Sequence, residues 1–161
     1  MRLILVTIFS ILFFFNSNFI YPENIKKRGT VTGLEIPRFV SLKKSRTFLR
    51  RGPGKSYKID WILEKYSYPL KVLGEHNHWR QVIDFEGDEG WVYFRLLSGK
   101  RTVIISKEKV FLMKSYKKES KPIAVLKYGV IGNLLKESEK FCKVKFQNYT
   151  GWVKKDNVWG C

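Results

Sequence analysis

The chain alternates between short apolar segments of about five residues and polar turns that recur roughly every 8 to 12 residues. Within the segments, apolar and polar side chains alternate: Leu70 and Val72 flank Lys71, and Trp79-Arg80 and Gln81-Val82 each place an apolar residue beside a polar one. Alternation of this kind is typical of a β-strand with one buried face. Because no segment carries an extended helical period, the pattern predicts an all-β fold, either a small barrel or a sandwich.

The predicted strands occur twice in the same order, which indicates an internal duplication. The tripeptide Gly90-Trp91-Val92 returns 61 residues later as Gly151-Trp152-Val153. A glycine repeated inside a strand predicts that another backbone approaches closely at that point. Each copy should also end in a short 3₁₀ turn. The strand candidates are residues 39–41, 47–50, 61–63, 70–75, 79–83 and 89–93, then 103–106, 110–113, 124–126, 131–136, 141–146 and 149–154, with the turns at 96–99 and 157–160.

The N-terminal segment has the features of a secretory signal. Met1 and Arg2 provide a short positive head, and an apolar run from Leu3 to Phe15 follows. This run is too short to span a bilayer comfortably, although an uncleaved anchor stays an alternative. We therefore predict a signal peptide over residues 1–18, a spacer over 19–38, a first module over 39–99 and a second over 100–161. Export would place the protein in the periplasm or cell envelope.

The chain has two cysteines, Cys142 and Cys161. In an oxidising compartment such as the one predicted here, two cysteines can pair. A disulfide between them would close a loop of 19 residues, which in the chain-entropy model stabilises the fold by about 3 kcal/mol. Two free thiols are the alternative, because Cys161 is the terminal residue of the sequence.

Positive charge is concentrated in the second copy. The chain contains 31 Lys and Arg against 14 Asp and Glu, and residues 101–161 carry 14 basic and 5 acidic side chains. An excess of this sign favours polyanionic partners, and Lys117, Lys118 and Lys121 are the candidate contacts. The alternative is that the lysines serve solubility alone.

The first copy resembles a bacterial SH3 domain. The segment Phe48-Leu49-Arg50-Arg51-Gly52-Pro53-Gly54-Lys55-Ser56-Tyr57, then Trp79-Arg80-Gln81-Val82 and Gly90-Trp91-Val92, carries the resemblance. It implies two tandem small SH3-like barrels after an N-terminal signal segment, the second divergent because its Gly-Pro turn is absent. The family implies a binding role, in which peptidoglycan or an envelope protein or peptide is the partner.

Five residues of the first copy are candidates for ligand binding. Arg50 and Arg51 adjoin the Gly-Pro-Gly turn, where a guanidinium can clamp a carboxylate. Tyr57, Tyr66 and Tyr68 lie in loop-rich segments and offer stacking area to a sugar or peptide. Since a Gly-Pro turn restricts its loop before binding, we expect the ligand groove mainly in the first copy. We expect Trp79 and Trp91 to fill the barrel cores instead.

No catalytic or metal-binding constellation emerges from the sequence. His76 and His78 have no third ligand cluster with them, and Cys142 lies in a repeat strand without a nucleophile motif. We therefore expect a non-enzymatic protein without a cofactor. The alternative function is a basic polyanion-binding protein that takes an acidic glycan, a lipid headgroup or nucleic acid, although export argues against nucleic acid. The oligomeric state stays open.

Overall fold

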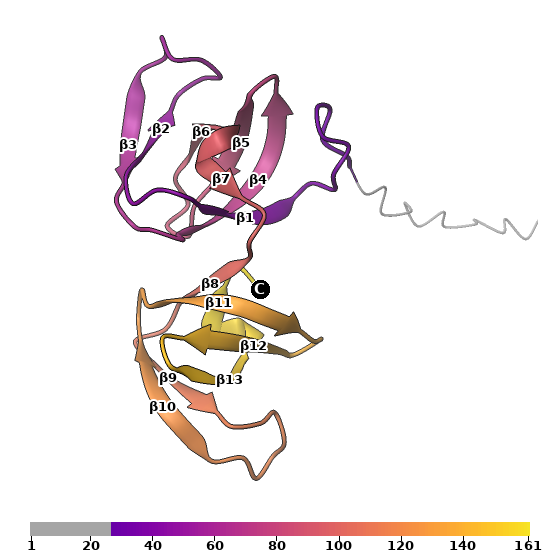
Figure 1. Cartoon of the computed structure of the whole chain (residues 1–161), viewed down its shortest axis with the longest axis vertical. Helices are drawn as coiled ribbons and strands as arrows, with labels where there is room; N and C mark the ends of the chain where they lie inside the picture. The colour runs from indigo at the N-terminus through magenta and orange to yellow at the C-terminus, as the bar shows by residue number, and fades with distance from the viewer. Residues whose placement is uncertain (1–26) are drawn as a thin grey trace, which may run out of the picture.

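The computed structural model describes residues 27–161, and these form two antiparallel β-sheets (Figure 1). The predicted signal peptide and residues 19–26 lie outside the described residues. Within the described part of the chain, the only helical segments are two 3₁₀ turns. The predicted all-β fold of two small barrels is therefore confirmed.

The two sheets have the same strand order, so the duplication predicted from the sequence extends to the topology. The first sheet runs β3-β2-β6-β5-β4-β1-β7 and the second runs β10-β9-β13-β12-β11-β8-β14. The first barrel comprises β1 (Arg38–Leu42), β2 (Thr47–Arg50), β3 (Ile59–Leu63), β4 (Pro69–His76), β5 (Trp79–Ile83), β6 (Glu89–Tyr93), η1 (Phe94–Leu96) and β7 (Leu97–Ser98). The second comprises β8 (Thr102–Ile105), β9 (Lys109–Met113), β10 (Pro122–Lys127), β11 (Ile131–Glu137), β12 (Phe141–Phe146), β13 (Tyr149–Lys154), η2 (Lys155–Asn157) and β14 (Val158–Trp159).

Each barrel has its own core of branched aliphatic side chains, which alternate with outward-facing residues along the strands. Leu49, Leu70 and Val82 are fully buried in the first barrel, and Leu112 and Val144 in the second. Burying a side chain of this size contributes about 1.5 to 3 kcal/mol. Leu and Val are compact enough to fill a barrel of this size.

The expectation that Trp79 and Trp91 fill the core is wrong. Both indoles are half-buried on the outer face of the first sheet, where Trp79 meets the Tyr93 ring edge-on at 5.6 Å and Trp91 meets His76 at 6.5 Å. Along β5 the inward positions belong to Arg80 and Val82. Trp79 therefore lies on the outer face of β5, opposite to the face expected for it.

The repeated glycines lie where two backbones approach, as predicted. A Cβ added at Gly90 would come within 2.8 Å of the Arg50 carbonyl oxygen, and one at Gly151 within 2.5 Å of the Met113 carbonyl oxygen. No side chain fits at either position without moving the neighbouring strand. The two 3₁₀ turns form a few residues earlier than predicted, over η1 and η2.

The end of the predicted spacer is part of the first barrel. Residues 27–38 fold back on themselves through an isolated bridge between Arg28 and Glu35. Ile36 is buried in the first core. This segment, called the N-terminal arm below, forms hydrogen bonds to Glu75 of the barrel. The Thr32 hydroxyl and two backbone amides donate to the Glu75 carboxylate, and the Thr30 hydroxyl donates to the Glu75 backbone carbonyl oxygen.

The two barrels contact each other through aromatic and polar groups, and the C-terminus lies between the two sheets (Figure 1). The Trp159 ring packs at 4.9 Å from Phe39 and at 6.2 Å from Phe85. Thr102 Oγ1 donates to the Ser67 carbonyl oxygen at 2.7 Å. Ile104, from the second barrel, belongs to the core cluster of the first. The two barrels therefore share part of one core.

The C-terminal residue is covalently tied to the second barrel. Cys142 on β12 and Cys161 form a disulfide with an S–S distance of 2.06 Å.

None of the helical segments in residues 27–161 has the length and hydrophobicity that a membrane span requires.

Candidate functional site

The arginines of the predicted first-barrel site are engaged by their own loop. Arg50 Nη1 donates to the carbonyl oxygens of Lys55 at 3.0 Å and of Tyr57 at 2.8 Å. Arg51 forms a two-pronged ion pair with Asp60, at 3.2 Å from Nε and 3.0 Å from Nη2. Both guanidiniums therefore stabilise the loop between β2 and β3. A ligand carboxylate would have to compete with these contacts.

The three predicted tyrosines lie in different surroundings. The Tyr57 ring packs where a side chain on Gly52 or Gly54 would sit, so it covers the Gly-Pro-Gly turn. Tyr66 is exposed. Tyr68 is buried, and burial raises the pKa of its phenol, with a further increase from the charges of Asp84 and Glu86.

The structure does not bring the five predicted residues together. Arg50, Arg51 and Tyr57 adjoin the β2–β3 loop, which lies at the end of the first barrel remote from the second (Figure 1). The connection from β3 to β4, which includes Tyr66 and Tyr68, lies at the opposite end.

A groove lies on the surface of the second barrel. It has a volume of about 520 Å³ and lies between the β9–β10 loop and the strands β12 and β13. Aromatic rings and lysines dominate its lining. We call this the basic aromatic groove, and define it by Lys109, Phe111, Tyr116, Lys117, Lys118, Phe141, Trp152 and Lys154.

Three of the four rings of the groove, those of Tyr116, Phe141 and Trp152, form a connected cluster. Tyr116 meets Trp152 nearly at right angles with 5.0 Å between ring centroids, and meets Phe141 at 6.3 Å. Lys109 Nζ lies 5.4 Å from the centre of the Phe111 ring. Rings in this arrangement offer an apolar surface against which sugar rings or peptide planes can pack.

The loop that supplies Tyr116 holds its shape without the Gly-Pro-Gly turn. The Ser115 amide donates to Ser120 Oγ at 2.8 Å, and the Ser115 hydroxyl accepts from the Lys117 amide at 3.2 Å. A backbone hydrogen bond from Lys114 to Lys121 closes the base of the loop at 3.0 Å. Serine hydroxyls and this backbone hydrogen bond therefore restrain the loop where the first copy has its Gly-Pro-Gly turn.

The lysines of the groove keep their charge uncompensated. No Asp or Glu lines it, and the ion pairs among the described residues leave Lys109, Lys117, Lys118 and Lys154 out. Of the predicted polyanion contacts, Lys117 and Lys118 line the groove. Lys121 is exposed at the base of the loop instead.

The aromatic members of the groove were missed at the sequence level. Phe111, Tyr116, Phe141 and Trp152 lie up to 41 residues apart in the chain, and only the fold brings them together. The available signal was the repeat itself: Phe141 and Trp152 correspond to Trp79 and Trp91, so an aromatic pair recurs at the same place in both copies.

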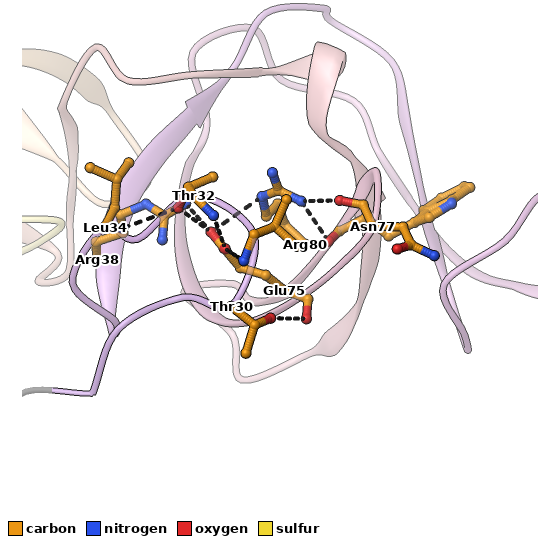
Figure 2. A network of polar contacts seen from close by, with 9 residues as sticks. Thr30, Thr32, Leu34, Arg38, Glu75, Asn77 and Arg80 are labelled. Carbon is orange, nitrogen blue, oxygen red and sulfur yellow. Dashed lines mark hydrogen bonds and ion pairs between the residues drawn. The ribbon is translucent and has the colours of Figure 1, made fainter.

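A second polar centre fixes the N-terminal arm to the first barrel (Figure 2). The Glu75 carboxylate accepts from the Thr32 hydroxyl at 2.7 Å, the Thr32 amide at 2.8 Å and the Val31 amide at 3.0 Å. Arg38 Nη2 lies 2.7 Å from the carboxylate and Arg80 Nε 3.4 Å. Burial alone would raise the pKa of Glu75, but the hydrogen bonds from Thr32, Arg38 and Val31 outweigh burial and lower the pKa to about 2.

Comparison with known families gives one match, which occurs twice. The family model described as "Bacterial SH3 domain" matches residues 43–99 and again residues 106–160. The two matched segments fall on the two sheets. A comparison with curated proteins gives no match.

Three solved structures are similar to the chain at low identity. NlpC2 from Trichomonas vaginalis has 13% identity and a TM-score of 0.35, and covers 76% of this chain and 48% of its own. NlpC1 from the same organism has 12% identity and a TM-score of 0.36, and the match covers 81% of this chain and 48% of NlpC1. An NlpC/P60 family protein from Bacillus cereus has 14% identity and a TM-score of 0.34, and the match covers 75% of this chain and 55% of that protein. The chain thus spans about half the length of these structures.

Proposed function

Because the chain belongs to the bacterial SH3 domain family, we propose that it is a non-enzymatic binding protein of the cell envelope that holds an anionic wall polymer, such as peptidoglycan, in its basic aromatic groove. The observation that carries this proposal is the set of unpaired lysines around a cluster of rings. An acidic glycan or peptide provides both matching features, namely carboxylates for the lysines and flat or apolar surfaces for the rings.

Several features support a binding role over a catalytic one. The Cys142 sulfur is bonded to Cys161, so it is not available as a thiolate nucleophile. His76 and His78 pack against the rings of Trp91, Tyr93 and Phe94, and no cluster of three or more metal-binding side chains occurs among the described residues. The signal peptide predicted over residues 1–18 supports an envelope location. Mass spectrometry of the protein recovered from the cell envelope tests whether this segment is removed, and where.

A co-sedimentation experiment with purified peptidoglycan tests the groove. The mature protein should be retained at physiological salt, and the variant Lys117→Ala/Lys118→Ala/Trp152→Ala should lose at least tenfold in affinity, which corresponds to about 1.4 kcal/mol. The matched control is Lys143→Ala/Lys145→Ala on β12 of the same barrel, outside the groove lining. No retention of the unmodified protein would contradict the wall-polymer proposal.

The same experiment separates the two barrels. If Arg50→Ala/Arg51→Ala/Tyr57→Ala abolishes retention while the groove variant binds normally, the site belongs to the first barrel, as we expected from the Gly-Pro-Gly turn. We propose the second barrel because its groove of about 520 Å³ exceeds two hollows of the first barrel, of about 240 and 180 Å³, and because its lysines form no ion pair.

A less selective polyanion-binding protein is the second candidate, and the basic excess of residues 101–161 favours it. Binding that depends on charge alone weakens steeply as salt screens the lysines. A protein that binds every acidic polymer with equal affinity, and releases each at the same salt concentration, would fit this candidate instead of selective recognition of the wall.

A further inference from the structure

A second pocket lies on the first barrel, between the N-terminal arm and the sheet. It has a volume of about 180 Å³. Thr32 and Leu34 of the arm form one side, while Ser98 and Gly99 follow η1 on the other. Most of the remaining lining is apolar and includes Val40 and Leu97. The pocket is therefore built by the contact between the arm and the barrel.

Two arginines line this mainly apolar pocket. Arg80 has only 7% of its side chain exposed, and its Nη1 donates to the carbonyl oxygens of Asn77 and Trp79, each at 2.9 Å. Arg38 has 20% of its side chain exposed and reaches Glu75 through Nη2. Figure 2 shows both guanidiniums beside the Glu75 carboxylate. Two guanidiniums and one carboxylate leave an excess of one positive charge.

One donor of this cluster has no acceptor. Arg38 Nη1 is buried and makes no hydrogen bond within the described residues. A buried N–H group without a partner costs free energy comparable to a lost hydrogen bond, and the cost is greater for a charged group. Because this nitrogen is closed off from solvent, a ligand reaches it only after a shift of the Arg38 side chain. A carboxylate in the pocket would then supply the missing acceptor and balance the remaining positive charge.

We propose that this pocket binds the C-terminal carboxylate of a short peptide that ends in small apolar residues. The carboxylate would pair with Arg38, and the small side chains would contact Leu34, Val40 and Leu97. A volume of about 180 Å³ is suited to one or two such residues. The site is on the other barrel from the basic aromatic groove and does not depend on it.

Titration of the mature protein with N-acetyl-alanyl-alanine tests the proposal, with chemical shifts of the first barrel as the readout. The free acid should bind, and the same peptide with a C-terminal amide should bind at least tenfold more weakly. Arg38→Gln should reduce affinity for the acid by at least tenfold. The matched control is Arg101→Gln, because Arg101 occupies the equivalent place in the second barrel and pairs with Glu137 at 3.1 Å.

A second variant keeps the test independent of the Glu75 cluster. A side chain at Gly99 meets no atom within 4 Å of its Cβ, so Gly99→Leu should fold normally and occlude the pocket, which should abolish binding with the melting temperature unchanged. Equal affinity for acid and amide, or equal loss in Arg38→Gln and Arg101→Gln, would overturn the proposal, as would unchanged binding by Gly99→Leu. Normal binding by Lys117→Ala/Lys118→Ala would show that this pocket acts apart from the groove.

Discussion

At the scale of single residues, Glu75 shows how a buried charge can stabilise a small barrel. Its side chain is fully buried, yet it is surrounded by donors from the arm, from β1 and from β5. A buried carboxylate persists only where such donors replace water. The arm is therefore held by the ionised form of one residue.

This gives a prediction for acid stability. The pKa of Glu75 falls from an ordinary value of 4.5 to about 2 in the folded state. A lowered pKa means that the ionised group stabilises the fold fully above pH 4.5, and that this contribution, on the order of 1 to 3 kcal/mol, is lost as the pH falls toward 2. Denaturant unfolding from pH 7 to pH 2 should show this loss in the unmodified protein. Glu75→Gln should be less stable at pH 7 and should lose less stability on acidification; an identical pH dependence would contradict the assignment.

Gly90 carries a second prediction at this scale. Gly90→Val should destabilise the first barrel by about 2 kcal/mol or more, because its Cβ would press against Leu49 and the Arg50 carbonyl. Thermal unfolding followed by tryptophan fluorescence measures the effect. Gly99→Ala is the control, since its Cβ meets nothing within 4 Å. Equal melting temperatures for Gly90→Val and the unmodified protein would show that β2 and β6 can move apart without cost.

At the scale of elements, strand positions were predictable because alternation, turns and the repeat all agree. Which side chains of a strand point into the core was not predictable from the same signals. In β5 the charged Arg80 points inward, since Glu75 lies opposite it in the register, and Trp79 consequently points outward. A rule that places apolar residues inside fails wherever a buried ion pair takes the interior position. The aromatic groove was hidden for a related reason, as its rings come from distant strands and one loop.

The β9–β10 loop gives the prediction for this scale. Ser120→Ala removes the hydroxyl that accepts from the Ser115 amide, so the loop that carries Tyr116 should become more mobile. Because the groove would then be ordered only on binding, affinity for peptidoglycan should fall a few-fold, at a cost of about 1 kcal/mol. Hydrogen exchange of residues 114–121 measures the mobility. Faster exchange with unchanged affinity would show that the loop does not contribute to the groove.

The two copies use one position for different tethers. Glu75 and Arg80 are paired in the register of the first barrel, and Glu137 and Cys142 are paired at the same place in the second. In the first barrel this position holds the N-terminal arm through hydrogen bonds, whereas in the second it holds the C-terminal residue through a disulfide. Equivalent positions in the two copies therefore hold a terminal segment of the described chain, by hydrogen bonds in the first barrel and by a disulfide in the second.

At the scale of the whole molecule, the two barrels should unfold together. Trp159 joins them through its contacts with Phe39 and Phe85, and Ile104 is shared with the first core. Calorimetry of the mature protein should show one transition. Trp159→Ala should weaken the junction by about 2 kcal/mol, an estimate for a partly buried ring, and divide the transition into two. Leu135→Ala, at an exposed position of β11, is the control. Two transitions in the unmodified protein would show independent barrels.

The shared junction has a consequence for how the protein would engage a long polymer. If the groove and the arm pocket both bind the wall, the junction holds the two sites at a fixed separation. Once one site is bound, the other then experiences a high effective concentration of ligand, so avidity on a continuous polymer exceeds the affinity for any short fragment. The fixed separation would also select among polymers, because both sites could be occupied at once only where the sugar and peptide groups recur at the matching interval.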